Sequence, residues 1–160
     1  MTPKTLSKTA STDILQEHNL VVSTLGIDKA VVLDADKQML VLRRSQTHPT
    51  LAGQPDLPGG EIEPHEEPGA AVIREILEET GLVIDPSSIE LVYAGTDFWH
   101  DNYVRMLYIV KLPSSKPPIS LSFEHDQFQW RPVDELSEIE KDYIPFYARA
   151  FRYIQDNQIL

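Results

Sequence analysis

Three glutamates stand close together in the segment 60–82, at a spacing that suits metal binding. Glu75, Glu78 and Glu79 follow an i, i+3, i+4 pattern, which makes their side chains neighbours if the segment is helical. Hard divalent cations such as Mg²⁺ prefer carboxylate oxygens and usually keep water molecules that a phosphate can replace. Directly upstream, Gly59 and Gly60 would let the backbone approach a ligand closely. The pattern therefore indicates a site for a hard divalent cation to which a phosphate could bind.

The element that must position these glutamates is a helix predicted from about Pro68 to Thr80. Proline suits a first helical position, and Gly81 suits the residue after the last. An amphipathic helix that shows its charged face to water is the ordinary explanation of such a pattern. Two acids nevertheless stand in the last turn, where the helix dipole disfavours negative charge by roughly 0.3–1 kcal/mol each, and Arg74 precedes Glu78 in the less favourable order for an ion pair. A bound cation would remove this conflict. The face expected opposite the three glutamates consists of Ala70, Ile73, Ile76, Leu77 and Thr80.

The whole segment resembles the Nudix box, G-x5-E-x7-R-E-U-x-E-E-x-G-U, in which U is a bulky aliphatic residue. Every fixed position is filled at the right spacing, by Gly60, Glu66, Arg74, Glu75, Ile76, Glu78, Glu79, Gly81 and Leu82. The resemblance implies a single-domain α/β fold, namely an α/β/α sandwich around a mixed β-sheet. It also implies divalent-metal-dependent hydrolysis of a phosphoanhydride bond in a nucleoside diphosphate that is linked to another group X.

The resemblance extends to the roles of individual residues. It implies Mg²⁺, with Mn²⁺ as a substitute, held by box glutamates, a loop carbonyl and a glutamate from a separate loop: Glu75, Glu78, Glu79, Gly59 and Glu124. Arg74 is expected to orient a neighbouring glutamate, and Glu66 to brace the loop. A carboxylate must also take a proton from the attacking water. Glu75 and Glu78 are the first candidates for this role, and Glu124 is the third.

Glu124, Arg43 and Arg44 are further candidate residues outside the box. Glu124 opens the sequence EHDQFQW, which resembles the E-H-x-x-[FY]-x-W segment of several Nudix branches, although a solvated loop acid remains the alternative. Arg43 and Arg44 end an apolar run. Arg44 matches a position that often contacts substrate phosphate in the family, and arginine suits bidentate phosphate contact. Two ordinary surface arginines would explain the same pattern.

The substrate class is less well defined by the sequence. Phe98 and Trp99 could stack on a nucleobase, which is worth about 1–3 kcal/mol per base in single-strand binders, or could pack the chain itself. Many ADP-ribose pyrophosphatases carry a proline past the box where Asp97 and Phe98 stand here. This favours a nucleoside triphosphate or a dinucleoside polyphosphate. An ADP-ribose or nucleotide-sugar pyrophosphatase and a non-catalytic nucleotide-sensing module are the alternatives.

Strands are expected on both sides of the box. The apolar runs Ala30–Leu33 and Met39–Leu42 predict a hairpin. A second helix is predicted from about Glu138 to Asp156, interrupted at Pro145. Further strand-like runs are Val21–Ile27, Ile89–Ala94, Tyr103–Leu112 and Phe128–Val133.

Composition bounds the remaining possibilities. The chain has 160 residues, 41% of them hydrophobic, which predicts one domain over residues 19–160 after a peripheral or flexible segment 1–18. The lack of cysteine excludes thiolate sites, and the net charge of −11 disfavours a nucleic-acid partner over a small nucleotide. No apolar run suits a signal peptide or a membrane span, so a cytoplasmic protein is expected. The exposed-looking aromatic residues are compatible with a homodimer.

Overall fold

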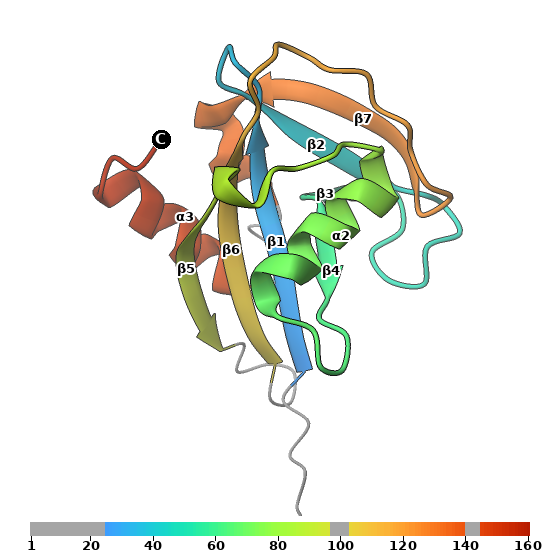
Figure 1. Ribbon diagram of the computed structural model, residues 1–160, viewed down its shortest axis with the longest axis horizontal. Coiled ribbons are helices and arrows are strands. Elements are labelled where there is room, and N and C mark those ends of the chain that lie inside the picture. Colours follow the sequence, from blue (N-terminus) through green and yellow to red (C-terminus); the bar gives the residue numbers. More distant parts are fainter. Residues whose placement is uncertain (1–24, 97–102, 140–144) are drawn as a thin grey trace, which may run out of the picture.

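The computed structural model describes residues 25–96, 103–139 and 145–160, and these residues form a mixed sheet of seven strands with helices against it (Figure 1). In chain order the elements are β1 (Leu25–Leu33), β2 (Gln38–Arg44), β3 (Pro55–Asp56), β4 (Gly59–Glu61), α2 (Pro68–Thr80), η1 (Pro86–Ser88), β5 (Ile89–Thr96), β6 (Tyr103–Lys111), β7 (His125–Pro132), η2 (Val133–Glu138) and α3 (Pro145–Asp156).

The sheet is built around a parallel pair of strands. β1 and β6 pair in parallel from Leu25 opposite Tyr103 to Leu33 opposite Lys111. Around this pair the strand order is β3-β2-β1-β6-β5, with β4 paired to β1 and β7 paired to β2. All of these other pairings are antiparallel. The mixed sheet expected from the sequence is therefore confirmed.

Helices cover both faces of the sheet. Side chains along a strand alternate between the two faces, so each face has apolar side chains that a helix can cover. On β1, Val31 packs in the core layer that contains α3, whereas Ala30 and Val32 pack in the layer that contains α2. Figure 1 shows α2 in front of the central strands and α3 on their other side. The predicted α/β/α sandwich is thus the observed architecture.

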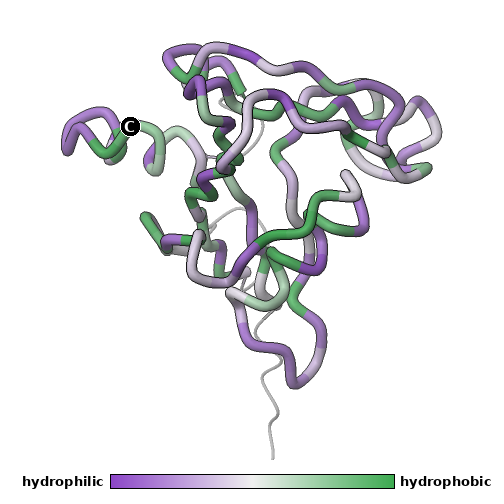
Figure 2. The backbone as a smooth tube through the Cα atoms, turned by 45° about the horizontal axis from the view of Figure 1, so that its top comes forward, coloured by the Kyte–Doolittle hydropathy of each residue, from purple (hydrophilic) through white to green (hydrophobic). Residues whose placement is uncertain are grey.

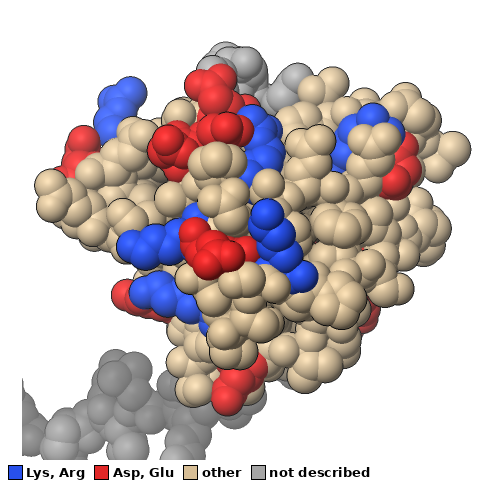
Figure 3. All heavy atoms as spheres, turned by 90° about the horizontal axis from the view of Figure 1, so that it is seen from above, with Lys and Arg blue, Asp and Glu red and all other residues tan. Residues whose placement is uncertain are grey.

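Charged side chains of both signs lie together on one face of the molecule. Figure 2 shows that the loop between β4 and α2 is mostly hydrophilic. On the face in Figure 3, acidic and basic side chains lie next to one another instead of forming separate fields. None of the helices within the described ranges combines the length and the apolar character that crossing a bilayer requires.

Most predicted elements are present, with four differences. The β1–β2 hairpin forms, with Leu33 opposite Met39, and the described part of the predicted strand Val21–Ile27, residues 25–27, belongs to β1. Residues 21–24 lie outside the described residues. In the described residues the second helix is α3, from Pro145 to Asp156, and Glu138, where it was predicted to begin, ends the 3₁₀ helix η2. Residues 140–144 of the predicted helix lie outside the described residues. β7 begins three residues before the predicted Phe128. The two- and three-residue strands β3 and β4 were not predicted, since such short pairings carry no periodicity.

Helix α2 has the predicted bounds but a different buried face. Gly81 ends it in the left-handed conformation, with φ of 73°, and its N–H donates to Leu77 O. Leu77 is nevertheless 47% exposed, whereas Glu79 is buried. The expectation that the three glutamates lie together on the face away from the core is therefore wrong. The helix packs through Ala71, Val72, Ile76, Glu79 and Thr80.

Candidate active site

The two glycines of β4 bring the backbone against two glutamates of α2. Gly59 has φ of 127°, and its N–H donates to Glu79 Oε2 at 2.8 Å. A Cβ at Gly59 would lie 2.2 Å from the carbonyl oxygen of Asp28, and a Cβ at Gly60 would lie 2.6 Å from the carboxyl carbon of Glu75. Glycine is therefore required at position 59 by its φ and by the Asp28 backbone, whereas a Cβ at position 60 would force the Glu75 carboxylate to move.

Arg74 ties the box together. Its Nε and Nη2 donate to the two carboxylate oxygens of Glu66, both at 2.9 Å, and its Nη1 donates to Glu75 at 2.7 Å and to Glu78 at 3.3 Å. Nη2 also donates to the carbonyl of Glu61. These contacts raise the pKa of Arg74, with the Glu66 hydrogen bonds as the largest cause. One guanidinium thus spans the loop and the helix, which is the geometry that the family resemblance leads one to expect.

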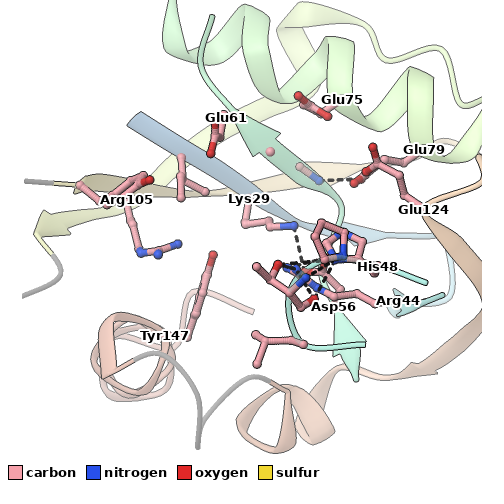
Figure 4. A pocket seen from close by; sticks show the side chains of 17 residues that line it. Lys29, Arg44, His48, Asp56, Glu61, Glu75, Glu79, Arg105, Glu124 and Tyr147 are labelled. Atoms are coloured by element: carbon pink, nitrogen blue, oxygen red, sulfur yellow. Dashed lines mark hydrogen bonds and ion pairs between the residues drawn. The ribbon is translucent and has the colours of Figure 1, made fainter. Parts of the chain in front are cut away.

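A pocket of about 870 Å³ lies beside these elements and has an acidic and a basic side (Figure 4). Glu75 and Glu79 project into it from α2, and Glu124 enters from the start of β7. Arg105 and Tyr147 lie at its other end in Figure 4. Carboxylates on one side and cations on the other can hold a metal-bound polyphosphate, because each side matches one of its two charges. The basic side chains that line the pocket are Lys29, Arg44 and Arg105.

Asp56 lies at the centre of a buried ionic cluster on the basic side. Its carboxylate contacts Lys29 Nζ at 2.9 Å, Arg44 Nη2 at 3.0 Å and His125 Nε2 at 3.4 Å. The other ring nitrogen of His125 lies 3.9 Å from Glu79 Oε1. The cluster therefore connects the basic side of the pocket to the acidic side.

Burial raises the pKa values of the two glutamates of α2 that line the pocket. It raises the pKa of Glu79 to about 7, although the charge of Lys29 opposes this shift. Burial also raises the pKa of Glu75, against the hydrogen bond from Arg74. Raised carboxyl pKa values in a pocket are typical of groups that bind or move protons and cations.

The structure separates the residues nominated from the sequence. Glu75, Glu79, Glu124, Gly59 and Arg44 line the pocket. Glu78 is 58% exposed at its side chain and does not line the pocket, so its metal and catalytic roles stay predictions.

Arg43 does not line the pocket; it lines a second, smaller pocket and pairs with Asp126 at 2.7 Å. Its predicted substrate contact has no support in this geometry. Phe98 and Trp99 lie outside the described residues.

Several polar residues of the pocket were not nominated from the sequence, among them Lys29, His48, Asp56, Glu61, Arg105 and Tyr147. Lys29 carried a usable signal, because it directly precedes the apolar run Ala30–Leu33 in the same strand and so places an ammonium group beside core side chains. Asp56 carried none, since its partners come from distant parts of the chain.

The donor set of the acidic side suits a hard divalent cation. Glu75, Glu79 and Glu124 are oxygen donors in one pocket, and Gly60 leaves the space that the Glu75 carboxylate occupies. Within residues 25–96, 103–139 and 145–160, no three His, Asp or Glu side chains converge closely enough to hold a metal ion together. The residues present therefore fit the metal by the chemistry of their oxygen donors and by the pocket they share, and a bound cation would have to draw the carboxylates closer together.

Comparisons with known proteins agree on one family. The NUDIX domain model matches residues 28–152. An RNA pyrophosphohydrolase of Rickettsia prowazekii (strain Madrid E) is 27% identical over 139 residues, covering 78% of this chain and 83% of that protein. Nudix hydrolase 22, chloroplastic, of Arabidopsis thaliana is 35% identical over 78 residues, 48% of this chain and only 25% of that protein. A MutT protein structure from Methanosarcina mazei Go1 shares the fold, with a TM-score of 0.65, 24% identity and coverage of 83% of this chain and 94% of that one.

Proposed function

This chain belongs to the NUDIX family, and from that premise we propose that it hydrolyses a phosphoanhydride bond in a nucleoside diphosphate linked to X. The observation that carries the proposal is the two-sided pocket. Glu75, Glu79 and Glu124 face into the same pocket as the cations Lys29, Arg44 and Arg105. A nucleotide polyphosphate with a divalent cation has both charges, and a pocket of about 870 Å³ can admit it.

Glu75, Glu79 and Glu124, with the carbonyl of Gly59, would hold Mg²⁺, or Mn²⁺ in its place. When bound, such a cation supplies positive charge to the phosphates and increases the acidity of water. Glu78 is set lower among the proposed ligands, because its carboxylate is exposed and pairs with Arg74 at 3.3 Å.

Glu75 is the proposed general base. Its carboxylate lines the pocket and is held by Arg74 at 2.7 Å, so its position is defined before substrate arrives. The attacking water would lose a proton to this carboxylate while the oxygen of the water forms a bond to phosphorus. The bond from phosphorus to the bridging oxygen would break, and the electron pair would leave with the departing phosphate or nucleotide. Glu124 is the alternative base.

A nucleoside triphosphate or a dinucleoside polyphosphate is the proposed substrate class. The name of the Rickettsia relative, RNA pyrophosphohydrolase, adds RNA to the candidate substrates. ADP-ribose or a nucleotide sugar is the second candidate. A non-catalytic nucleotide-sensing module is the third, although the box glutamates are all present.

The test is a substrate panel with magnesium, in which products are separated by anion-exchange chromatography. It contains nucleoside triphosphates, dinucleoside polyphosphates, 5′-triphosphorylated RNA, ADP-ribose and nucleotide sugars. Wild type should convert a member of the panel to a nucleotide and a second phosphate product, and Glu75→Gln should lose most of this activity. Tight nucleotide binding without any product would instead identify a sensing module.

A further inference from the structure

Lys29 is an unusual residue for its place in the fold. It lies on β1, on the face where Ile27 and Val31 also point, and it is only 5% exposed. Its ammonium group donates to the carbonyl of Leu57 at 2.9 Å and pairs with Asp56 at 2.9 Å. A charge at this depth costs free energy of desolvation, which an apolar side chain of similar volume would avoid. Fold stability alone therefore gives a weak reason for a lysine here.

The pocket gives a stronger reason. Lys29 lines it directly, and Figure 4 shows the side chain in the space between α2 and Asp56. Its charge lowers the pKa of both Glu75 and Glu79, although burial outweighs this effect. The ammonium group therefore lies within electrostatic reach of the acidic side of the pocket.

Asp56 groups Lys29 with a second cation. The same buried carboxylate contacts Arg44 Nη2 at 3.0 Å, so Asp56 pairs with both Lys29 and Arg44. The three side chains together carry a net charge of about +1 when all are ionised. Thr50 orients the Nη1 end of the guanidinium of Arg44 at 2.9 Å. Its Nε is buried and, among the described residues, has no hydrogen-bond partner. An anion bound at this side of the pocket would meet two fixed cations.

We propose that Lys29 binds substrate phosphate and that Asp56 is a positioning residue, which fixes Lys29 and Arg44 as one phosphate clamp opposite the glutamates. The inference rests on the proposed hydrolysis of a phosphoanhydride, and it names the residues that would recognise the phosphate chain. The competing explanation is that Lys29 only braces the Leu57 carbonyl and β3.

The probe is imidodiphosphate, whose P–N–P bridge resists hydrolysis, and its binding is measured by calorimetry with magnesium present. Lys29→Met removes the ammonium group, and Lys29→Arg keeps a cation. Asp56→Asn keeps both cations and releases them from the shared carboxylate. The matched control is Asp126→Asn, because Asp126 pairs with the neighbouring Arg43 at 2.7 Å outside the pocket.

Lys29→Met should weaken binding by about tenfold or more, since a hydrogen bond to a charged group contributes at least that much. Lys29→Arg should keep part of the affinity, and Asp56→Asn should weaken binding and raise KM more than it lowers kcat. Asp126→Asn should bind as wild type does. Sulfate at the same concentration should compete poorly if the clamp reads a phosphate chain.

Wild-type affinity in a folded Lys29→Met variant would overturn the proposal, as would wild type that does not bind imidodiphosphate. Thermal unfolding of each variant distinguishes a brace from a clamp, because a brace lowers the melting temperature without changing affinity. If Lys29→Met does not fold, Asp56→Asn decides, and unchanged affinity there refutes the positioning role. Binding needs no turnover, so a chain that fails on every substrate in the panel can still confirm or refute the clamp.

Discussion

Asp28 should impose a pH dependence on the stability of the metal-free protein. Its side chain is fully buried, and neither carboxylate oxygen has a hydrogen-bond partner in the described part of the chain. Burial, followed by the charge of Glu66, raises its pKa from 3.8 to about 7. The folded state therefore binds this proton more tightly than the unfolded state. The resulting stability is fully present below pH 3.8 and is lost as pH rises to about 7.

The magnitude follows from the two pKa values. A change from 3.8 to about 7 corresponds to about 4 kcal/mol once both states are ionised. Between about pH 5 and about pH 8 the contribution of Asp28 should fall by about 3 kcal/mol, since the unfolded carboxyl is already ionised through this window. Asp28→Asn has nearly the same shape and cannot ionise, so its stability should lack this fall.

The assay is urea unfolding in EDTA, for wild type and Asp28→Asn, at several pH values across that window. The difference in unfolding free energy between the two proteins removes the contribution of every other titrating group. Asp36→Asn is the control, because Asp36 is exposed in the turn between β1 and β2. Any fixed cost of a buried amide shifts the Asp28→Asn curve equally at all pH values. Parallel curves for wild type and Asp28→Asn would refute the claim that the folded carboxyl is protonated.

Three further predictions concern the box. Glu75→Gln should lower kcat by about 100-fold or more and Glu78→Gln by clearly less, because Glu75 lines the pocket and Glu78 does not. Equal losses of kcat in steady-state assays would contradict this ranking. Gly60→Ala should lower kcat at least about tenfold with normal circular dichroism, because the added Cβ displaces the Glu75 carboxylate. Full activity of this variant would show that the carboxylate adapts. Gly59→Ala should destabilise the fold by roughly 1–3 kcal/mol or more, because φ is 127° and the added Cβ would lie 2.2 Å from Asp28 O. An unchanged melting temperature would contradict this prediction.

Local features of the chain were predictable where the chemistry itself is local. Pro68 and Gly81 mark the two ends of α2 because one suits a first helical position and the other tolerates a positive φ. The box spacing led to Arg74, whose contacts with Glu66 and Glu75 span only eight residues of sequence. Short-range constraints of this kind survive in a sequence read without a structure.

The rotation of α2 was not predictable from periodicity. Leu77 and Glu79 are both compatible with a helical pattern, but the choice between them depends on what the sheet offers. The N–H of Gly59 on β4 donates a hydrogen bond to the buried Glu79 carboxylate, which compensates part of the cost of its desolvation. Leu77 therefore faces outward although it is the more apolar residue. Likewise, Lys29 and Asp56 meet only because the sheet brings β1 and β3 to the same pocket.

The net charge of the chain and the charge of its pocket lead to different expectations about partners. A total of −11 acts on an approaching polyanion from a distance and disfavours an extended duplex. A small polyphosphate that enters the pocket instead meets Lys29, Arg44 and Arg105 at short range, where the nearest charges outweigh the screened average. The glutamates opposite would repel the same ligand unless a cation accompanies it. An acidic surface with this pocket therefore selects for compact, metal-bound polyphosphates, and the basic side, more than the box, should determine which of them binds.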